Sequence, residues 1–286
     1  MQYSSKHYHP LNISRMNDIK PRKPLNKFWN RSPFFYRVRN RLLFREISVE
    51  ELSRINYNRY NPKHSIPEIF FKTSELIFKD ENADLTDFEK ALKIATWLRN
   101  NIKGGKGLGI NSEEALLLML NGGYGICSDF SQIFNNFCVV NDIKVREWGL
   151  KKVDAHTGGH SFNEIYDIQF KKWIAMDISK SVYFTAQNNI PLTAIELFQK
   201  ERKTNIKTIQ FNYNYTPSET VIFKFYLSNH YVPFVIDKYV NSNYDRYLKT
   251  FKFLPIPIIH GIALLSLNSY VYKKINKNET YNGIDK

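Results

Sequence analysis

GYGICSDFSQIF, residues 123–134, joins a glycine-rich turn to the start of an apolar helix. The apolar positions after the turn are spaced i, i+3, i+4, i+7, which predicts a helix over residues 126–139 with one buried face. They are Phe130, Ile133, Phe134 and Phe137. Cys127 then lies in the first helical turn, where unpaired backbone N–H groups and the helix dipole stabilise an anion such as a thiolate. This position suits a reactive thiol, but a buried structural cysteine is the default interpretation until partners are found.

The composition indicates a folded globular protein. Of 286 residues, 43% are hydrophobic and 15% aromatic, enough to bury a substantial core. Cys127 and Cys138 are the two cysteines; they lie eleven residues apart in one predicted helix, about 16 Å along its axis, so they cannot form a disulfide. This use of cysteine favours a reducing compartment, and the N-terminal residues MQYSSKHYHP lack the apolar core of an export signal. We therefore expect a cytoplasmic protein.

The positive charge is concentrated at the N-terminus. The net charge is +14, and residues 1–46 carry eleven lysines and arginines against two acidic residues. We interpret residues 1–47 as a basic arm, which either contacts an anionic surface or packs on the domain through the aromatic residues between 28 and 36. Packing is the favoured interpretation, because no nucleic-acid-binding motif accompanies the charge. We expect no specific nucleic-acid partner.

Helical patterns precede strand patterns along the chain. Residues 86–102, TDFEKALKIATWLRNNI, begin with capping-box spacing between Thr86 and Glu89, and a second helix begins at Ser112. After about residue 143 the pattern changes to that of strands, as in IKVREWGL and HSFNEIYDI. This order predicts an α+β domain over residues 48–245, with a mostly antiparallel sheet.

The C-terminal segment, residues 246–286, contains an uncharged stretch over residues 253–272. Its twenty residues are long enough to cross a bilayer as a helix, so membrane association of this stretch stays open. Two prolines, a histidine and an asparagine dilute the signal and favour a buried C-terminal helix instead.

A reactive Cys127 requires a base and a group that orients the base. His160 begins the strand pattern HSFNEIYD, and Asp177 ends the pattern KWIAMD. An antiparallel hairpin with its turn near residues 168–170 places His160 and Asp177 opposite each other, with Cβ atoms about 5 Å apart. Packed against Cys127, this pair would make the cysteine a candidate nucleophile.

Metal binding is the main chemical alternative. Cys127, His156 and His160 could be ligands, but two glycines between the histidines break any helix that would align them, and no fourth ligand is evident. We therefore expect no metal. Glu164 lies on the same face of its strand as His160. It either supports the site or is a residue of the sheet with no role in the chemistry.

Three motifs resemble the transglutaminase-like superfamily in their order and spacing, over roughly residues 85–180. They are GICSDF, HSFNEIY and WIAMD. The resemblance implies a fold related to papain-like proteases, with Cys127 as nucleophile, His160 as base, Asp177 as orienting acid and no cofactor. Phe162 departs from the family, which commonly has tryptophan there, and we expect this change to alter packing more than chemistry.

The resemblance also implies a function, namely cysteine-dependent acyl transfer on a peptide or protein substrate through a thioester. We expect hydrolysis first, because bacterial members of the superfamily are often peptidases or amidases; transamidation is the other outcome. The candidates for oxyanion binding are the backbone N–H of Cys127 with Tyr124 or Gln132, and Glu164 is a candidate supporting residue. The alternative is a catalytically idle binding module in a membrane-associated or larger assembly, against which the intact Cys/His/Asp set argues.

Overall fold

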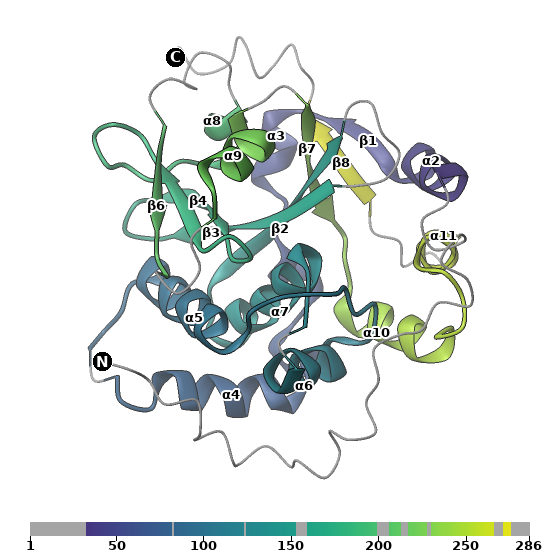
Figure 1. Ribbon diagram of the computed structural model, residues 1–286, viewed down its shortest axis with the longest axis horizontal. Coiled ribbons are helices and arrows are strands. Elements are labelled where there is room, and N and C mark those ends of the chain that lie inside the picture. The colour runs from purple at the N-terminus through teal and green to yellow at the C-terminus, as the bar shows by residue number, and fades with distance from the viewer. Residues whose placement is uncertain are drawn as a thin grey trace.

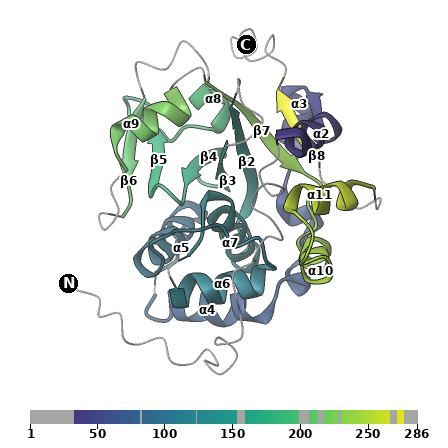
Figure 2. The same ribbon diagram turned by 45° about the vertical axis from the view of Figure 1, so that its right-hand side comes forward.

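The structure is a computed structural model that describes residues 33–81, 83–122, 124–152, 159–198, 206–212, 217–227, 230–265 and 271–275. A sheet crosses the molecule between two layers of helices (Figure 1, Figure 2). One face carries α4 (Glu68–Phe78), α5 (Asp87–Asn101), α6 (Ser112–Gly122) and α7 (Cys127–Val140). The other face carries the shorter helices α3 (Val49–Ser53), α8 (Ala194–Phe198) and α9 (Glu219–Ile222). The predicted α+β class is therefore confirmed.

The sheet has eight strands in the order β1-β8-β7-β2-β3-β4-β5-β6. Their bounds are β1 Phe44–Ile47, β2 Lys144–Lys152, β3 Gly159–Asp167, β4 Lys172–Asp177, β5 Val182–Thr185, β6 Lys207–Gln210, β7 Tyr231–Asp237 and β8 Val271–Ile275. All pairs are antiparallel except β1 with β8, so the sheet is mostly antiparallel, as predicted. The sheet includes residues from the predicted basic arm (β1) and from the C-terminal segment (β8).

The predicted helices form where their local signals place them. At the start of α5, Glu89 N donates to Thr86 Oγ1 at 3.2 Å and Thr86 N donates to a Glu89 carboxylate oxygen at 2.9 Å, which completes the capping box. α6 begins at Ser112, and α7 begins at Cys127 within one residue of the predicted start. The other described elements are α2 (Pro33–Leu43), the 3₁₀ turns at Tyr57–Tyr60 and Lys63–Ser65, a π turn at Phe223–Leu227, α10 (Asn241–Thr250) and α11 (Ile256–Leu265).

α7 is the central helix of the larger layer. It packs against β2 and β3 on one side and against α4, α5 and α6 on the other. Its aromatic residues Phe130, Phe134 and Phe137 are at most 1% exposed, and Phe137 meets Phe70 of α4 edge-on at a centroid distance of 5.1 Å. Because a close-packed core resists displacement, the N-terminus of α7 is held in a fixed position relative to the sheet.

The register of the β3–β4 hairpin differs from the predicted one. Asp167 pairs with Lys172 and Asn163 with Met176, so continuing the register places Asp177 opposite Phe162 rather than His160. The cause is the turn: four residues, 168–171, connect the strands, two more than direct pairing of His160 with Asp177 would require. The shift of two residues keeps both side chains on the same face of the sheet.

The predictions for the two ends of the chain, a basic arm packed on the domain and a buried C-terminal helix, are met only in part. Residues 1–32 lie outside the described residues, and Phe34 in α2 is 66% exposed rather than packed in the core. Within the apolar stretch 253–272, the described helix α11 has ten residues, with Ile259 and Ala263 buried, and residues 266–270 lie outside the description. Among the described residues, no helix is long and apolar enough to span a membrane.

A buried carboxyl group lies between β2 and α7. Glu147 is 9% exposed and accepts a hydrogen bond from Asn135 Nδ2 at 3.0 Å. Asn163 Nδ2 donates to the oxygen of the same Asn135 side chain at 2.8 Å. Burial raises the pKa of Glu147 to about 8, although the hydrogen bond from Asn135 opposes that rise. Glu147 therefore stays protonated in the folded protein at neutral pH.

We expect Glu147→Gln to remove part of the pH dependence of stability. A raised pKa in the folded state stabilises the fold below the unfolded-state pKa, and this contribution is lost as the pH rises towards 8. Between pH 6 and 8 the loss should be on the order of 2 kcal/mol in the wild type and absent from the variant. Urea unfolding of both proteins at pH 6 and pH 8 measures it. Equal pH slopes in the two proteins would contradict a buried, protonated Glu147.

Candidate active site

Cys127 is the first residue of α7 and is half-buried. The preceding residue, Ile126, is extended (φ −112°, ψ −179°), and its N–H donates to Asp129 Oδ2 at 2.9 Å. The same carboxylate oxygen accepts a hydrogen bond from Leu108 N at 3.3 Å. Burial raises the pKa of Asp129 to about 6, although these two hydrogen bonds lower it. Asp129 thus connects the start of the cysteine helix to the glycine-rich loop over 103–109.

Backbone hydrogen bonds join the same loop to the residues before Cys127. Gly105 N donates to Gly125 O at 2.8 Å, and Gly125 N donates to Lys106 O at 3.0 Å. Gly125 has φ +116°, and a Cβ there would lie 2.8 Å from Met119 Cε. Only glycine adopts this conformation readily, so the turn that sets the direction of α7 depends on it.

His160 and Asp177 form a buried pair. His160 Nε2 lies 2.5 Å from Asp177 Oδ2, and both side chains are almost completely buried. The other carboxylate oxygen, Oδ1, accepts hydrogen bonds from Ser179 Oγ at 2.9 Å and from Lys180 N at 3.0 Å. The diagonal approach across the hairpin therefore places Asp177 in contact with the edge of the imidazole ring.

The electrostatics favour an ionised pair. Burial alone lowers the pKa of His160, but the charge and hydrogen bond of Asp177, with a contact from Cys127, outweigh burial and raise the pKa to about 10. Burial raises the pKa of Asp177, and the imidazolium with its hydrogen bonds lowers it below the usual range for an aspartate. The structure thus brings together the three residues predicted from the motifs. Because Nε2 faces Asp177, Nδ1 is the ring nitrogen left for Cys127.

Two residues at this site were not found from the sequence. The ring of Phe225 stacks on His160 at a centroid distance of 4.4 Å and an interplanar angle of 21°. The hydroxyl of Tyr226 donates to Asp177 Oδ2 at 2.8 Å. Both come from the π turn that follows α9, almost fifty residues after Asp177. No periodic or capping signal in FKFYL marks them, because their role depends on a long-range contact.

The other sequence candidates have different partners. The amide of Gln132 donates to Tyr239 Oη at 2.6 Å and to Asn241 Oδ1 at 2.9 Å. Gln132 is also five residues along α7 from Cys127, which turns it about 140° around the helix axis. Tyr124 is half-buried, and its ring lies over Gly122, where an added Cβ would be 2.5 Å from it. These contacts hold Gln132 away from Cys127, and the oxyanion role of the Cys127 N–H and of Tyr124 stays a prediction.

Glu164 belongs to a buried ion pair on the sheet. Its Oε2 accepts hydrogen bonds from Arg146 Nε at 2.6 Å and from Trp148 Nε1 at 2.5 Å. Its Oε1 accepts from Ala194 N, at the start of α8, at 2.5 Å. These contacts fix α8 against the sheet. Glu164 therefore holds two elements of the fold together, at a position two residues further along β3 than Phe162.

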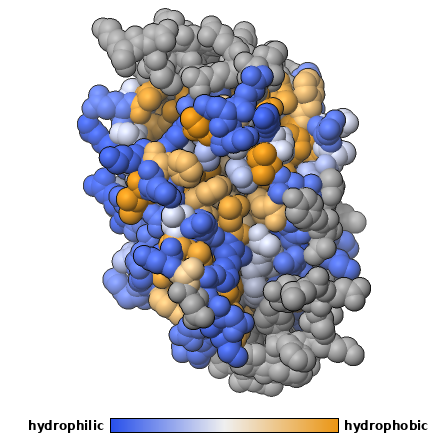
Figure 3. All heavy atoms as spheres, turned by 90° about the vertical axis from the view of Figure 1, so that its left-hand side faces the viewer, coloured by the Kyte–Doolittle hydropathy of each residue, from blue (hydrophilic) through white to orange (hydrophobic). Residues whose placement is uncertain are grey.

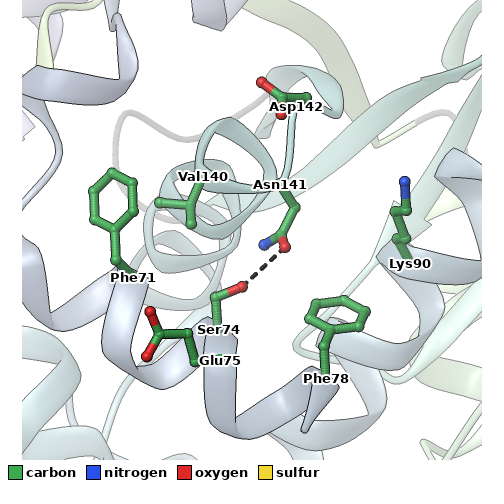
Figure 4. Close-up of a pocket in the computed structure, with 8 residues that line it drawn as sticks. All are labelled: Phe71, Ser74, Glu75, Phe78, Lys90, Val140, Asn141 and Asp142. Carbon is green, nitrogen blue, oxygen red and sulfur yellow. Dashed lines mark hydrogen bonds between the residues drawn. The ribbon is translucent and has the colours of Figure 1, made fainter. Parts of the chain in front are cut away.

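One hollow on the described surface lies away from Cys127. A surface hollow of about 350 Å³ lies between α4, α5 and the C-terminal end of α7, about 20 Å along α7 from Cys127 (Figure 4). The hydroxyl within it, that of Ser74, donates to Asn141 Oδ1 at 2.9 Å. On the face of the molecule shown in Figure 3, apolar groups lie between hydrophilic side chains. His156 lies outside the described residues, within which no cluster of three metal-ligating side chains occurs.

A half-buried cysteine at a helix N-terminus, beside a buried His–Asp pair on an antiparallel sheet, is typical of the α+β class that includes the papain-like and transglutaminase-like folds. Residues 77–178 match the transglutaminase-like superfamily, so the chain contains a domain of that superfamily.

A solved structure from Cytophaga hutchinsonii, described as a "Putative Cysteine Protease", is similar to the chain with 21% sequence identity and a TM-score of 0.29. The similarity covers 39% of this chain and 38% of that protein. No curated protein matches the chain.

Proposed function

We propose that this protein is a cysteine-dependent acyl-transfer enzyme that acts on a carboxamide or peptide bond, with hydrolysis as its main reaction. The observation that carries the proposal is the buried His160–Asp177 pair, 2.5 Å apart, in contact with the half-buried Cys127 at the N-terminus of α7. The superfamily of the domain supports the same chemistry.

The first half of the proposed reaction forms a thioester. The sulfur of Cys127 attacks the carbonyl carbon of the substrate, and the carbonyl oxygen takes the electron pair of the C=O bond. The backbone N–H of Cys127, directed outward at the helix N-terminus, is the donor that we assign to this oxyanion. When the carbonyl re-forms, the C–N bond breaks, and imidazolium His160 gives its proton to the leaving amine.

The second half returns the enzyme to its starting state. His160, now neutral, takes a proton from a water molecule, whose oxygen attacks the thioester carbonyl and releases a carboxylic acid and the thiolate. A primary amine in place of water gives transamidation by the same steps. Asp177 stays ionised and holds the imidazole in one orientation, a role consistent with its lowered pKa.

The charge state of His160 suits this sequence. With a pKa raised to about 10, its ring is an imidazolium at neutral pH and lies in contact with Cys127. The resting enzyme would then hold the proton for the leaving group before substrate binds.

The test is to trap the acyl-enzyme with a panel of peptides that contain glutamine side chains or C-terminal amides, in the presence and absence of a fluorescent primary amine. We expect intact-protein mass spectrometry to show one acyl group, located on Cys127 by peptide mapping, and release of ammonia or of an amine with the free acid. Free acid as the main product supports hydrolysis, and incorporated amine supports transamidation. If binding occurs with no acyl-enzyme and no product, the protein is an idle binding module and the proposal is wrong.

A further inference from the structure

One short segment contacts both members of the His160–Asp177 pair. It consists of α9 and the π turn Phe223–Leu227, and Ser218 caps its start by accepting a hydrogen bond from Val221 N. Phe225 covers the face of the imidazole at 4.4 Å, while the adjacent Tyr226 bonds to Asp177 Oδ2 at 2.8 Å. Neighbouring residues in a regular strand would point to opposite faces, so the π turn is what directs both side chains to one pair.

The segment is fixed in place by its packing on the sheet. Tyr226 is fully buried, with ring contacts to Phe184 at 4.6 Å, Phe162 at 5.5 Å and Phe198 at 6.0 Å. Phe225 packs against Tyr231 of β7 at 5.1 Å. The hydroxyl of Tyr226 therefore has a defined position, and Asp177 is its partner.

The contacts restrict both the position of the imidazole edge and the tilt of the ring plane. The hydrogen bond from Nε2 to Asp177 Oδ2 holds the ring edge, and the stack of Phe225 prevents the ring from tilting out of its plane. Oδ2 accepts from both His160 and Tyr226, while Oδ1 is held by Ser179 and Lys180 N. These donors stabilise the charged form of Asp177 and fix the direction in which it faces His160.

We propose that residues 219–227 are a positioning segment of the active site, in which Tyr226 fixes Asp177 and Phe225 fixes the ring of His160. Both act through the catalytic pair rather than on the reacting bond. This inference rests on the proposed function for its effect on turnover, but the contacts themselves do not depend on any substrate.

Tyr226→Phe removes only the hydroxyl and tests the first contact. Because the donated hydrogen bond favours the carboxylate, its loss should raise the pKa of Asp177, so the acid limb of the kcat/KM profile should move to higher pH by about one unit. We expect kcat to fall about tenfold, the rate equivalent of one hydrogen bond to a charged group, with KM changed less than about twofold.

Tyr57→Phe is the matched control. Tyr57 is also buried, and its hydroxyl donates one hydrogen bond, to Asn136 Oδ1 at 2.9 Å, on the α7 side of the sheet. The two variants lose the same group and should lose similar stability in urea unfolding. If Tyr57→Phe shifts the acid limb as much as Tyr226→Phe does, the effect is a general loss of stability and the inference fails.

A second measurement separates this inference from the proposed function. The ring carbons of ¹³C-labelled His160 report protonation of Asp177 by NMR without any substrate, and their acid transition should move upward in Tyr226→Phe. If the acid transition moves upward in Tyr226→Phe but neither the wild type nor the variant turns over a substrate, the proposed function is rejected and the positioning contact is supported. Turnover with an unchanged transition would reject the contact.

Phe225→Leu tests the second contact, and it serves as the test of the segment if Tyr226→Phe does not fold. The substitution keeps an apolar side chain at this position. It removes the flat ring from the imidazole face and leaves every hydrogen bond to Asp177 in place. We expect kcat to fall several-fold with an unchanged acid limb. Wild-type kcat in Phe225→Leu would show that the stack does not position His160.

Discussion

Cys127→Ser should lower turnover by at least about a thousandfold while the protein remains folded, since residues that act as a catalytic unit carry most of the rate enhancement. A serine hydroxyl ionises at a much higher pH than a thiol and is not converted to an alkoxide by the imidazolium of His160. The substitution changes one half-buried atom at the first position of α7, so the fold should tolerate it. Steady-state assays with the best amide substrate, and circular dichroism of the same samples, measure both effects.

Cys138→Ser is the matched control for that experiment, because it makes the same change eleven residues later in the same helix. Cys138 is fully buried, and burial raises the pKa of its thiol well above the ordinary value. We expect full activity and a loss of about 1–3 kcal/mol of stability from the buried hydroxyl. Full activity in Cys127→Ser would mean that this cysteine is ordinary helix packing and would reject the proposed mechanism.

The parts of the fold that could be predicted from sequence are those with local causes. The capping box at Thr86, the glycine turn before Cys127 and the apolar stripe of α7 depend on neighbouring residues, so the chain itself specifies them. The same reasoning places Cys127 at a helix N-terminus, although its role as a nucleophile is inferred only with His160 and Asp177 as partners.

The register of the hairpin could not be predicted to the residue. The turn DIQFKK has none of the dipeptides that specify a two-residue loop, and the observed four-residue loop has Lys171 at φ +49°. Even so, His160 and Asp177 meet, because a shift of two residues preserves the face of each side chain.

Phe225 and Tyr226 lay beyond sequence reasoning for a different reason. Their contacts with His160 and Asp177 join residues 65 and 49 positions apart. Such pairs depend on the packing of the whole sheet. An aromatic run such as FKFYL is equally typical of residues that only pack in a hydrophobic core. The assignment of Glu164 had the same difficulty: the alternation correctly placed it on the face of His160, but its ion pair with Arg146 came only with the structure.

His160→Ala should be as damaging to turnover as Cys127→Ser, because it removes both the proton acceptor and the acid for the leaving amine. It should also destabilise the fold by about 3–5 kcal/mol, since Asp177 remains as a buried charge without its partner. Asp177→Asn should lower kcat less or to a similar extent: the imidazole stays, but it loses the charge that raises its pKa and the acceptor that orients it.

The double variant His160→Ala/Asp177→Asn separates the chemical loss from the structural one. Removing the charge of Asp177 together with His160 leaves no unpaired ion, so the double variant should recover much of the stability lost in His160→Ala. Its turnover should not recover, because no group remains to move the proton between Cys127 and the leaving amine. Urea unfolding and turnover of the wild type, the two single variants and the double variant measure this cycle. If activity returns with stability, the two residues serve folding alone, and the base of any reaction at Cys127 must be another group.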